Sequence, residues 1–203
     1  MKKKVLYIHG FLSGGNSTTI ISLQKHYGHK YDFIVPELDA DASVSIPKLN
    51  EIIKNETPSL IIGNSLGGFY ALMCDSGDIP IIVINPCVNP YEHLKRYLNK
   101  KLEYHNKRND GATTYMLTQE TLETFKEYNN IKDKIKANVG NVFALLSDKD
   151  ETLGDTHIKL FKKIKEETAY PYEFFEIYND FGHRLTHDTM KYLRDIIDNV
   201  MYG

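Results

Sequence analysis

The sequence feature that most constrains this chain is a short apolar run that ends in a serine flanked by glycines. Residues 60–62 are apolar, Ser65 stands two residues from Gly63 and from Gly67, and an apolar helical pattern begins at Phe69. A chain that passes from strand to helix in so few residues must turn sharply, and a Cβ at either glycine would crowd the turn. The pattern therefore predicts a buried strand, a tight turn that contains the serine, and a helix.

The pattern G-x-S-x-G between a strand and a helix is that of a nucleophile elbow. In such an elbow the hydroxyl of Ser65 would stand above the edge of the sheet, at the N-terminus of the following helix. Free backbone N–H groups and the helix dipole favour negative charge at that place. A plainer interpretation is a glycine-rich turn whose serine takes no part in chemistry. The apolar strand before the turn and the apolar helix after it favour the elbow.

The overall composition is that of a globular protein. The chain has 203 residues, 41% of them hydrophobic and 26% charged, with a formal net charge of −2. This length is typical of one domain, and this charge implies no general attraction to nucleic acid or to membranes. The apolar stretch 5–8 is too short for a signal peptide. We therefore expect a cytoplasmic protein in which Cys74 and Cys87 are buried, reduced thiols.

Strand and helix patterns alternate along most of the chain. We expect strands over residues 5–8, 31–35, 60–62, 81–84, 141–146 and 172–178. We expect helices from 16 or 17 to 27, around 47–53, over 66–75, over 154–167, and after 186, with a polar loop over 39–45. This alternation predicts a mostly parallel sheet with helices on both faces. The loops that follow the strands then share one rim, where active sites of such sheets lie.

The segment 91–137 interrupts this alternation and is rich in charged residues. A capping pattern at Thr118 predicts a short helix from there to Tyr128. We interpret the whole segment as an insertion over the rim, a cap or lid. Its basic residues form either a solvated surface or a site for an anionic leaving group, phosphorylated or coenzyme A-like. They are Lys95, Arg96, Lys100, Lys101, Lys107 and Arg108.

A serine hydroxyl needs a base within hydrogen-bond reach, and the base needs a partner that orients it. His183 follows the sixth expected strand, and Asp148 and Asp150 follow the fifth. A histidine after a strand is by itself often a surface or packing residue. Three strand ends that supply serine, acid and base in this chain order favour a catalytic triad. We favour Asp150 as the acid because it lies further out, where it can reach the Nδ1 of His183, and Asp148 is the alternative.

Backbone N–H groups are expected to bind the oxyanion. One belongs to Leu66, the residue after the serine, and the other to the loop after the first strand, with Phe11 as the favoured residue and Leu12 as the next. His9 precedes this loop, and we expect it to shape the loop rather than to act as a base.

A metal site is the competing interpretation of the last loop. His183 and His187 are four residues apart, as are the histidines of H-E-x-x-H. Residue 184 is arginine where that motif needs glutamate, so we expect no metal.

These residues together resemble the α/β-hydrolase superfamily. The stretch His9 to Ser13 and the elbow 63–68 are more narrowly similar to the small bacterial YqiA/YcfP-like esterases. The resemblance covers nearly the whole chain and is weakest over 91–137. It implies an α/β-hydrolase fold with a minimal, mostly parallel sheet of about six strands and helices on both faces. It also implies a single domain, 1–203, in which 91–137 is a small cap insertion.

The same resemblance implies a serine carboxylesterase that needs no cofactor. Carried over by position, it makes Ser65 the nucleophile, Asp150 the acid and His183 the base. The expected substrate is a small-molecule ester with a short acyl group, and no nucleic-acid or membrane partner is expected. Two alternatives stay open: an acyl thioesterase, and a hydrolase-fold binding protein without catalytic activity.

Overall fold

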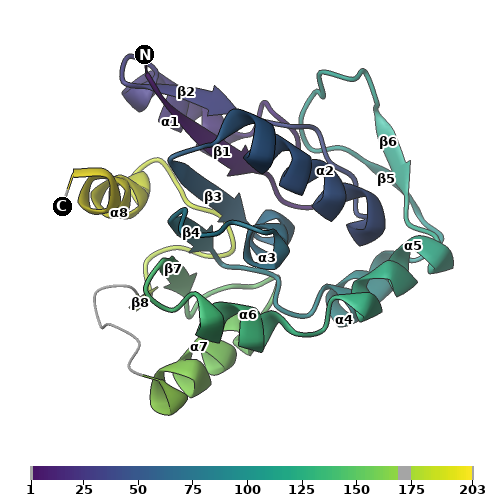
Figure 1. Cartoon of the computed structure of the whole chain (residues 1–203). Helices are drawn as coiled ribbons and strands as arrows, with labels where there is room; N and C mark the ends of the chain where they lie inside the picture. The colour runs from purple at the N-terminus through teal and green to yellow at the C-terminus, as the bar shows by residue number, and fades with distance from the viewer. Residues whose placement is uncertain (1, 169–174, 203) are drawn as a thin grey trace.

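The protein is described by a computed structural model that covers residues 2–168 and 175–202. Its centre is a sheet of six parallel strands in the order β2-β1-β3-β4-β7-β8 (Figure 1). The strands are β1 (Lys3–Ile8), β2 (Tyr31–Ile34), β3 (Leu60–Asn64), β4 (Ile81–Ile84), β7 (Val142–Ser147) and β8 (Phe175–Tyr178). All six expected strands are present, and the part of the last one over 172–174 lies outside the described residues.

Helices cover both faces of this sheet, as the alternation predicts. Successive side chains of a strand point to opposite faces, so Tyr7 packs with one helix layer and Leu6 with the other. The first layer consists of α1 (Thr18–Tyr27) and α8 (Met190–Tyr202). The second layer consists of α2 (Ala42–Glu56), α3 (Leu66–Met73), α6 (Ile131–Ala137) and α7 (Thr156–Glu167). The inner strands β1, β3, β4 and β7 are largely buried on both sides, which is why they read as apolar runs, whereas the edge strands β2 and β8 have exposed residues.

The segment between β4 and β7 contains short elements that the periodicity does not reveal. They are α4 (Pro90–Leu94), the 3₁₀ helix η1 (Lys95–Tyr97), β5 (Lys101–Glu103), β6 (Thr114–Met116), α5 (Gln119–Glu123), the 3₁₀ helix η2 (Thr124–Glu127) and α6. The strands β5 and β6 pair antiparallel in a separate small sheet (Figure 1). The helix expected over 118–128 divides into α5 and η2, and Thr118 caps it by accepting a hydrogen bond from the N–H of Thr121 at 3.1 Å.

The polar loop expected over 39–45 is wrong in its second half, because α2 begins at Ala42. The Asp41 carboxylate caps this helix by accepting the N–H of Ser43 at 3.0 Å. The hydroxyl of Ser45 donates to the carbonyl of Asp39 at 2.9 Å. The Asp41 side chain, which reads as loop in the sequence, thus satisfies a free N–H at the helix start, and Ser45 binds the loop just before the helix.

The two cysteines are free and buried, as expected. Burial raises the pKa of the Cys74 and Cys87 thiols to about 12, so both are protonated at neutral pH. Across residues 2–168 and 175–202, no helix combines the length and the apolar character that a membrane crossing needs.

Candidate active site

Ser65 occupies the turn between β3 and α3 in a strained backbone conformation, with φ 54° and ψ −117°. The turn packs tightly against β1. The carbonyl of Gly67 occupies the space that a Cβ at Gly63 would need, and the carbonyls of Ile8 and His9 occupy the space at Gly67. Glycine at these two positions is what lets the turn approach the neighbouring backbone.

Three side chains from three strand ends form one hydrogen-bonded chain. The Nε2 of His183 lies 2.9 Å from the Oγ of Ser65, and its Nδ1 lies 2.8 Å from the Oδ2 of Asp150. All three residues are buried, with 5 to 8% of their surface exposed. The structure therefore brings together the serine after β3, the aspartate after β7 and the histidine after β8.

The second carboxylate oxygen of Asp150 is also satisfied. Its Oδ1 accepts the backbone N–H groups of Thr152 at 2.8 Å and Leu153 at 2.7 Å. Burial raises the pKa of Asp150, but hydrogen bonds from His183 and from these two N–H groups outweigh it and leave the pKa below its usual value. Asp150 is therefore a carboxylate at neutral pH, as a partner for a positive imidazole must be.

The alternative acid and the alternative metal ligand both lie elsewhere. Asp148 is exposed, and its backbone N–H donates to the carbonyl of Tyr178 at 3.0 Å. His187 is almost fully exposed and lies 3.3 Å from the Asp188 carboxylate, whereas His183 is buried. Within residues 2–168 and 175–202, no group of three or more potential metal ligands gathers in one place.

The two residues expected to supply N–H groups to an oxyanion lie next to the serine. Leu66 is the first residue of α3, so its N–H has no partner within the helix. The loop after β1 passes directly over the serine, because a Cβ on Gly10 would lie 3.2 Å from the Cβ of Ser65. Phe11 and Leu66 line the same cavity as Ser65, and Leu12, the other candidate, lines it too with a φ of 55°.

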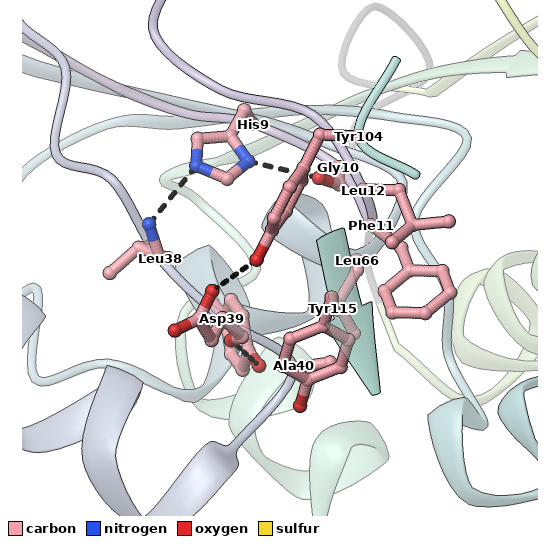
Figure 2. A pocket seen from close by; sticks show the side chains of 11 residues that line it. His9, Gly10, Phe11, Leu12, Leu38, Asp39, Ala40, Leu66, Tyr104 and Tyr115 are labelled. Carbon is pink, nitrogen blue, oxygen red and sulfur yellow. Dashed lines mark hydrogen bonds between the residues drawn. The ribbon is translucent and has the colours of Figure 1, made fainter. Parts of the chain in front are cut away.

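His9 holds the start of this loop by two hydrogen bonds. Its Nε2 accepts the backbone N–H of Leu38 at 3.1 Å, so the proton is on Nδ1, which donates to the carbonyl of Gly10 at 2.9 Å (Figure 2). Burial lowers the pKa of His9, which keeps the ring neutral. The ring makes its hydrogen bonds to backbone groups, in agreement with the expected role in shaping the loop.

Two cavities meet at Ser65 and His183. The larger has a volume of about 560 Å³, and the segment after β4 supplies much of its wall. The residues from that segment are His93, Leu94, Arg96, Tyr97, Leu102, Glu103 and His105. The smaller, of about 150 Å³, lies toward the start of α1 and is lined by Ser17, Thr18, Thr19 and Asn106 among others. A substrate held across the serine could place a different part in each cavity.

Asn85 is a residue of this site that sequence reasoning missed. It is fully buried after β4, with a φ of 40°. Its Nδ2 donates to the carbonyls of Gly182 and His183, both at 3.1 Å, and its Oδ1 accepts the N–H of Ser147 at 2.7 Å. A polar residue directly after an apolar strand on the same rim was the available signal. Asn85 connects the ends of β4 and β7 to the histidine loop.

Comparison with known families gives a match over almost the whole chain. Residues 4–198 match the family described as "Uncharacterised protein family (UPF0227)". The UPF0227 protein YcfP of Salmonella paratyphi B is 29% identical over 119 residues, which cover 49% of this chain and 59% of YcfP. The YcfP protein of Salmonella newport matches equally well. The chain thus spans somewhat less than two thirds of the curated relatives that it matches.

Solved structures with this fold include esterases. Est1E from Butyrivibrio proteoclasticus has a TM-score of 0.71 at 14% identity, over 100% of this chain and 89% of Est1E. The esterase domain of a Rhodothermus marinus protein has a TM-score of 0.64 at 15% identity, over 97% and 84% of the two chains. Mouse alpha/beta hydrolase domain-containing protein 10 has a TM-score of 0.65 at 14% identity, over 98% of this chain and 89% of the mouse chain. This chain therefore belongs to the UPF0227 family, resembles YcfP, and has the α/β-hydrolase fold.

Proposed function

We propose that this protein is a serine carboxylesterase that cleaves esters of short acyl groups through an acyl-enzyme at Ser65. The observation that carries the proposal is the hydrogen-bonded chain from Ser65 through His183 to Asp150 beside a cavity of about 560 Å³. That several solved proteins of this fold are esterases supports the same reaction class.

The reaction follows from the roles of these groups. His183 Nε2 takes the hydroxyl proton as Ser65 Oγ attacks the ester carbonyl carbon, and the oxyanion that forms is bound by the N–H groups of Phe11 and Leu66. The C–O bond to the alcohol then breaks, and His183 returns the proton to the leaving oxygen. Water, deprotonated by His183, attacks the acyl-enzyme and releases the carboxylic acid with Ser65 restored. Asp150 stabilises the imidazolium in both halves.

A thioesterase is the second candidate, because Arg96 and Arg184 line the cavity and could contact an anionic leaving group. Glu103 and Glu151 line it as well, so the cavity has no clear excess of positive charge. Arg108, another basic residue of the segment, is buried against carboxylates outside this cavity. We therefore place the ester first, and turnover of a short p-nitrophenyl ester against an acyl-coenzyme A separates the two.

Replacing the nucleophile tests the proposal directly. The substitution Ser65→Ala is expected to lower ester turnover by at least about 10³-fold, because it removes the hydroxyl that His183 Nε2 contacts. The thermal midpoint should stay nearly the same, since the substitution removes a single oxygen. Turnover and thermal unfolding of both proteins are the measurements, with a panel of esters and thioesters of varied acyl length as substrates.

A fluorophosphonate probe provides the control for activity from another source. It should label wild-type protein at Ser65 and leave the Ser65→Ala protein unlabelled. Unlabelled wild-type protein that turns over no member of the panel would instead indicate a binding protein without catalytic activity. Ser65→Ala turnover near that of wild type would place the nucleophile elsewhere.

A further inference from the structure

The backbone of the histidine loop is held by side chains from the ends of β4 and β7. Ser147 Oγ donates to the carbonyl of Phe181, and Asn85 donates to the carbonyls of Gly182 and His183. These contacts satisfy three acceptors of the loop. The backbone N–H of His183 belongs to the same loop, and its direction affects where the imidazole begins from the main chain.

This N–H is bound by the carboxylate of Glu151, a residue to which the sequence analysis assigned no role. The Oε2 of Glu151 accepts the N–H of His183 at 2.9 Å. Glu151 follows Asp150 directly, and Asp150 holds the other end of the same residue through Nδ1 at 2.8 Å. Two adjacent carboxylates of one loop therefore bind His183: Glu151 accepts its backbone N–H, and Asp150 contacts its ring.

The chain makes room for this contact at Gly182. A Cβ at that position would overlap the Oε2 of Glu151, and the three atoms nearest to it all belong to the Glu151 carboxylate. Gly182 is not among the glycines with positive φ, so its backbone conformation does not require glycine. The absence of a side chain at 182 instead leaves room for the Glu151 carboxylate. Asp150 and Ser147 are buried, whereas Glu151 is exposed, so Glu151 can be replaced without opening the core.

We propose that Glu151 is a positioning residue, which acts through His183 by holding its backbone N–H so that the ring spans Asp150 and Ser65. This inference rests on the proposed hydrolytic function, for which it adds a residue outside the triad. A ring displaced by a fraction of an ångström loses the alignment of its two hydrogen bonds, and such misplacement lowers the rate without changing how substrate binds.

The first test compares two substitutions with a matched control. Glu151→Ala should lower kcat and kcat/KM together, by about 10-fold or more, with KM little changed. Glu151→Gln keeps an oxygen that can accept the N–H and should stay within about 3-fold of wild type. Glu166→Ala is the control, an exposed carboxylate on α7 that does not line this cavity, and should leave kcat unchanged. Equal damage from the alanine and the glutamine at 151, or no damage from the alanine, overturns the proposal.

The second test uses the glycine. Gly182→Ala should displace the Glu151 carboxylate and so reproduce the loss of kcat that Glu151→Ala causes. In the double variant the two losses should not multiply, because both remove the same hydrogen bond. Losses that multiply would show that Gly182 acts independently of Glu151, against the proposal.

An NMR measurement made without substrate can test the positioning role of Glu151 independently of the proposed hydrolytic function. The proton between His183 Nδ1 and Asp150 should give a downfield NMR resonance in wild type and in Glu151→Gln, and a broadened or lost one in Glu151→Ala. If wild type hydrolyses nothing but this pattern holds, the proposed function fails and the positioning role stands. If the resonance is the same in all three proteins, the positioning role is wrong.

Discussion

Asp148 and Asp150 are two residues apart in one loop, and only Asp150 contacts His183. Substitution Asp150→Asn should lower kcat by about 10⁴-fold, because an amide that donates to Nδ1 leaves the ring in the wrong tautomer and cannot stabilise its cation. Asp148→Asn is the matched control and should leave kcat within about 2-fold. Steady-state turnover of both variants tests this assignment. A large loss of kcat in Asp148→Asn and a small one in Asp150→Asn would instead make Asp148 the acid.

The histidine loop shows how much of a site lies outside its reacting atoms. Asn85 and Ser147 have no place in a search for nucleophile, base and acid, yet they bind the carbonyls of the loop from residue 181 to His183. Their polar atoms are buried, so each must find a partner or cost free energy. The loop carbonyls are those partners, and the histidine is held as a consequence.

The junction between β3 and α3 is the element on which the position of Ser65 depends. Gly67→Ala should lower the free energy of unfolding by about 3 kcal/mol, because its methyl group would overlap the backbone carbonyls of Ile8 and His9. These backbone carbonyls belong to the last residue of β1 and to the residue after it, and they cannot rotate away as a side chain can. Urea unfolding measures the effect.

Gly140→Ala is the control for this prediction, since no atom lies within 4 Å of a Cβ built there. Its free energy of unfolding should stay within about 0.5 kcal/mol of wild type. Equal stability of the two alanine variants would mean that the junction has room to relax.

At the scale of the whole molecule, Arg108 connects the segment after β4 to the loop after β2. Its side chain is 2% exposed and donates to the carbonyl of Leu38 at 2.9 Å. It also pairs with Asp110 within its own segment and lies 3.4 Å from Asp39 and 3.7 Å from Glu37. This buried arginine therefore attaches the segment after β4 to the rest of the protein, near the loop that passes over Ser65.

Arg108→Met should therefore lower the free energy of unfolding at pH 7 by about 2–3 kcal/mol, since two of the three carboxylates are half-exposed and solvent screens their share. Hydrogen bonds from Arg108 lower the pKa of Asp110 from 3.8 to about 2. The stabilisation from this pair is complete above pH 3.8 and is lost as the pH falls through about 2. Thermal unfolding should therefore show the difference in stability between wild type and Arg108→Met becoming smaller as the pH falls from 3.8 to about 2.

The neighbouring Lys107→Met is the control for Arg108. Lys107 is exposed, and its side chain makes no ion pair within the described residues. The free energy of unfolding of the Lys107→Met protein should equal that of wild type at every pH. A similar loss from both substitutions would indicate an effect of net charge rather than of the buried contacts.

Strand periodicity predicted the six-stranded sheet because its inner strands are largely buried on both faces and read as apolar runs. The same logic failed over 91–137. There β5 and β6 have three residues each, and Lys101, Glu103, Thr114 and Met116 are exposed. Short strands with exposed side chains leave no apolar period to detect, so the hairpin and its place beside the cavity were not foreseen.

Residue patterns alone were enough to predict the sheet, its rim, and the serine, the histidine and two candidate acids on that rim, because buried strands and tight turns restrict which residues can occur. The three-dimensional arrangement was needed to show that Asp150 rather than Asp148 contacts the imidazole, and that Asn85 and Glu151 bind the backbone of the histidine loop. Such choices depend on directions and distances between residues far apart in the chain, and local residue patterns do not encode them.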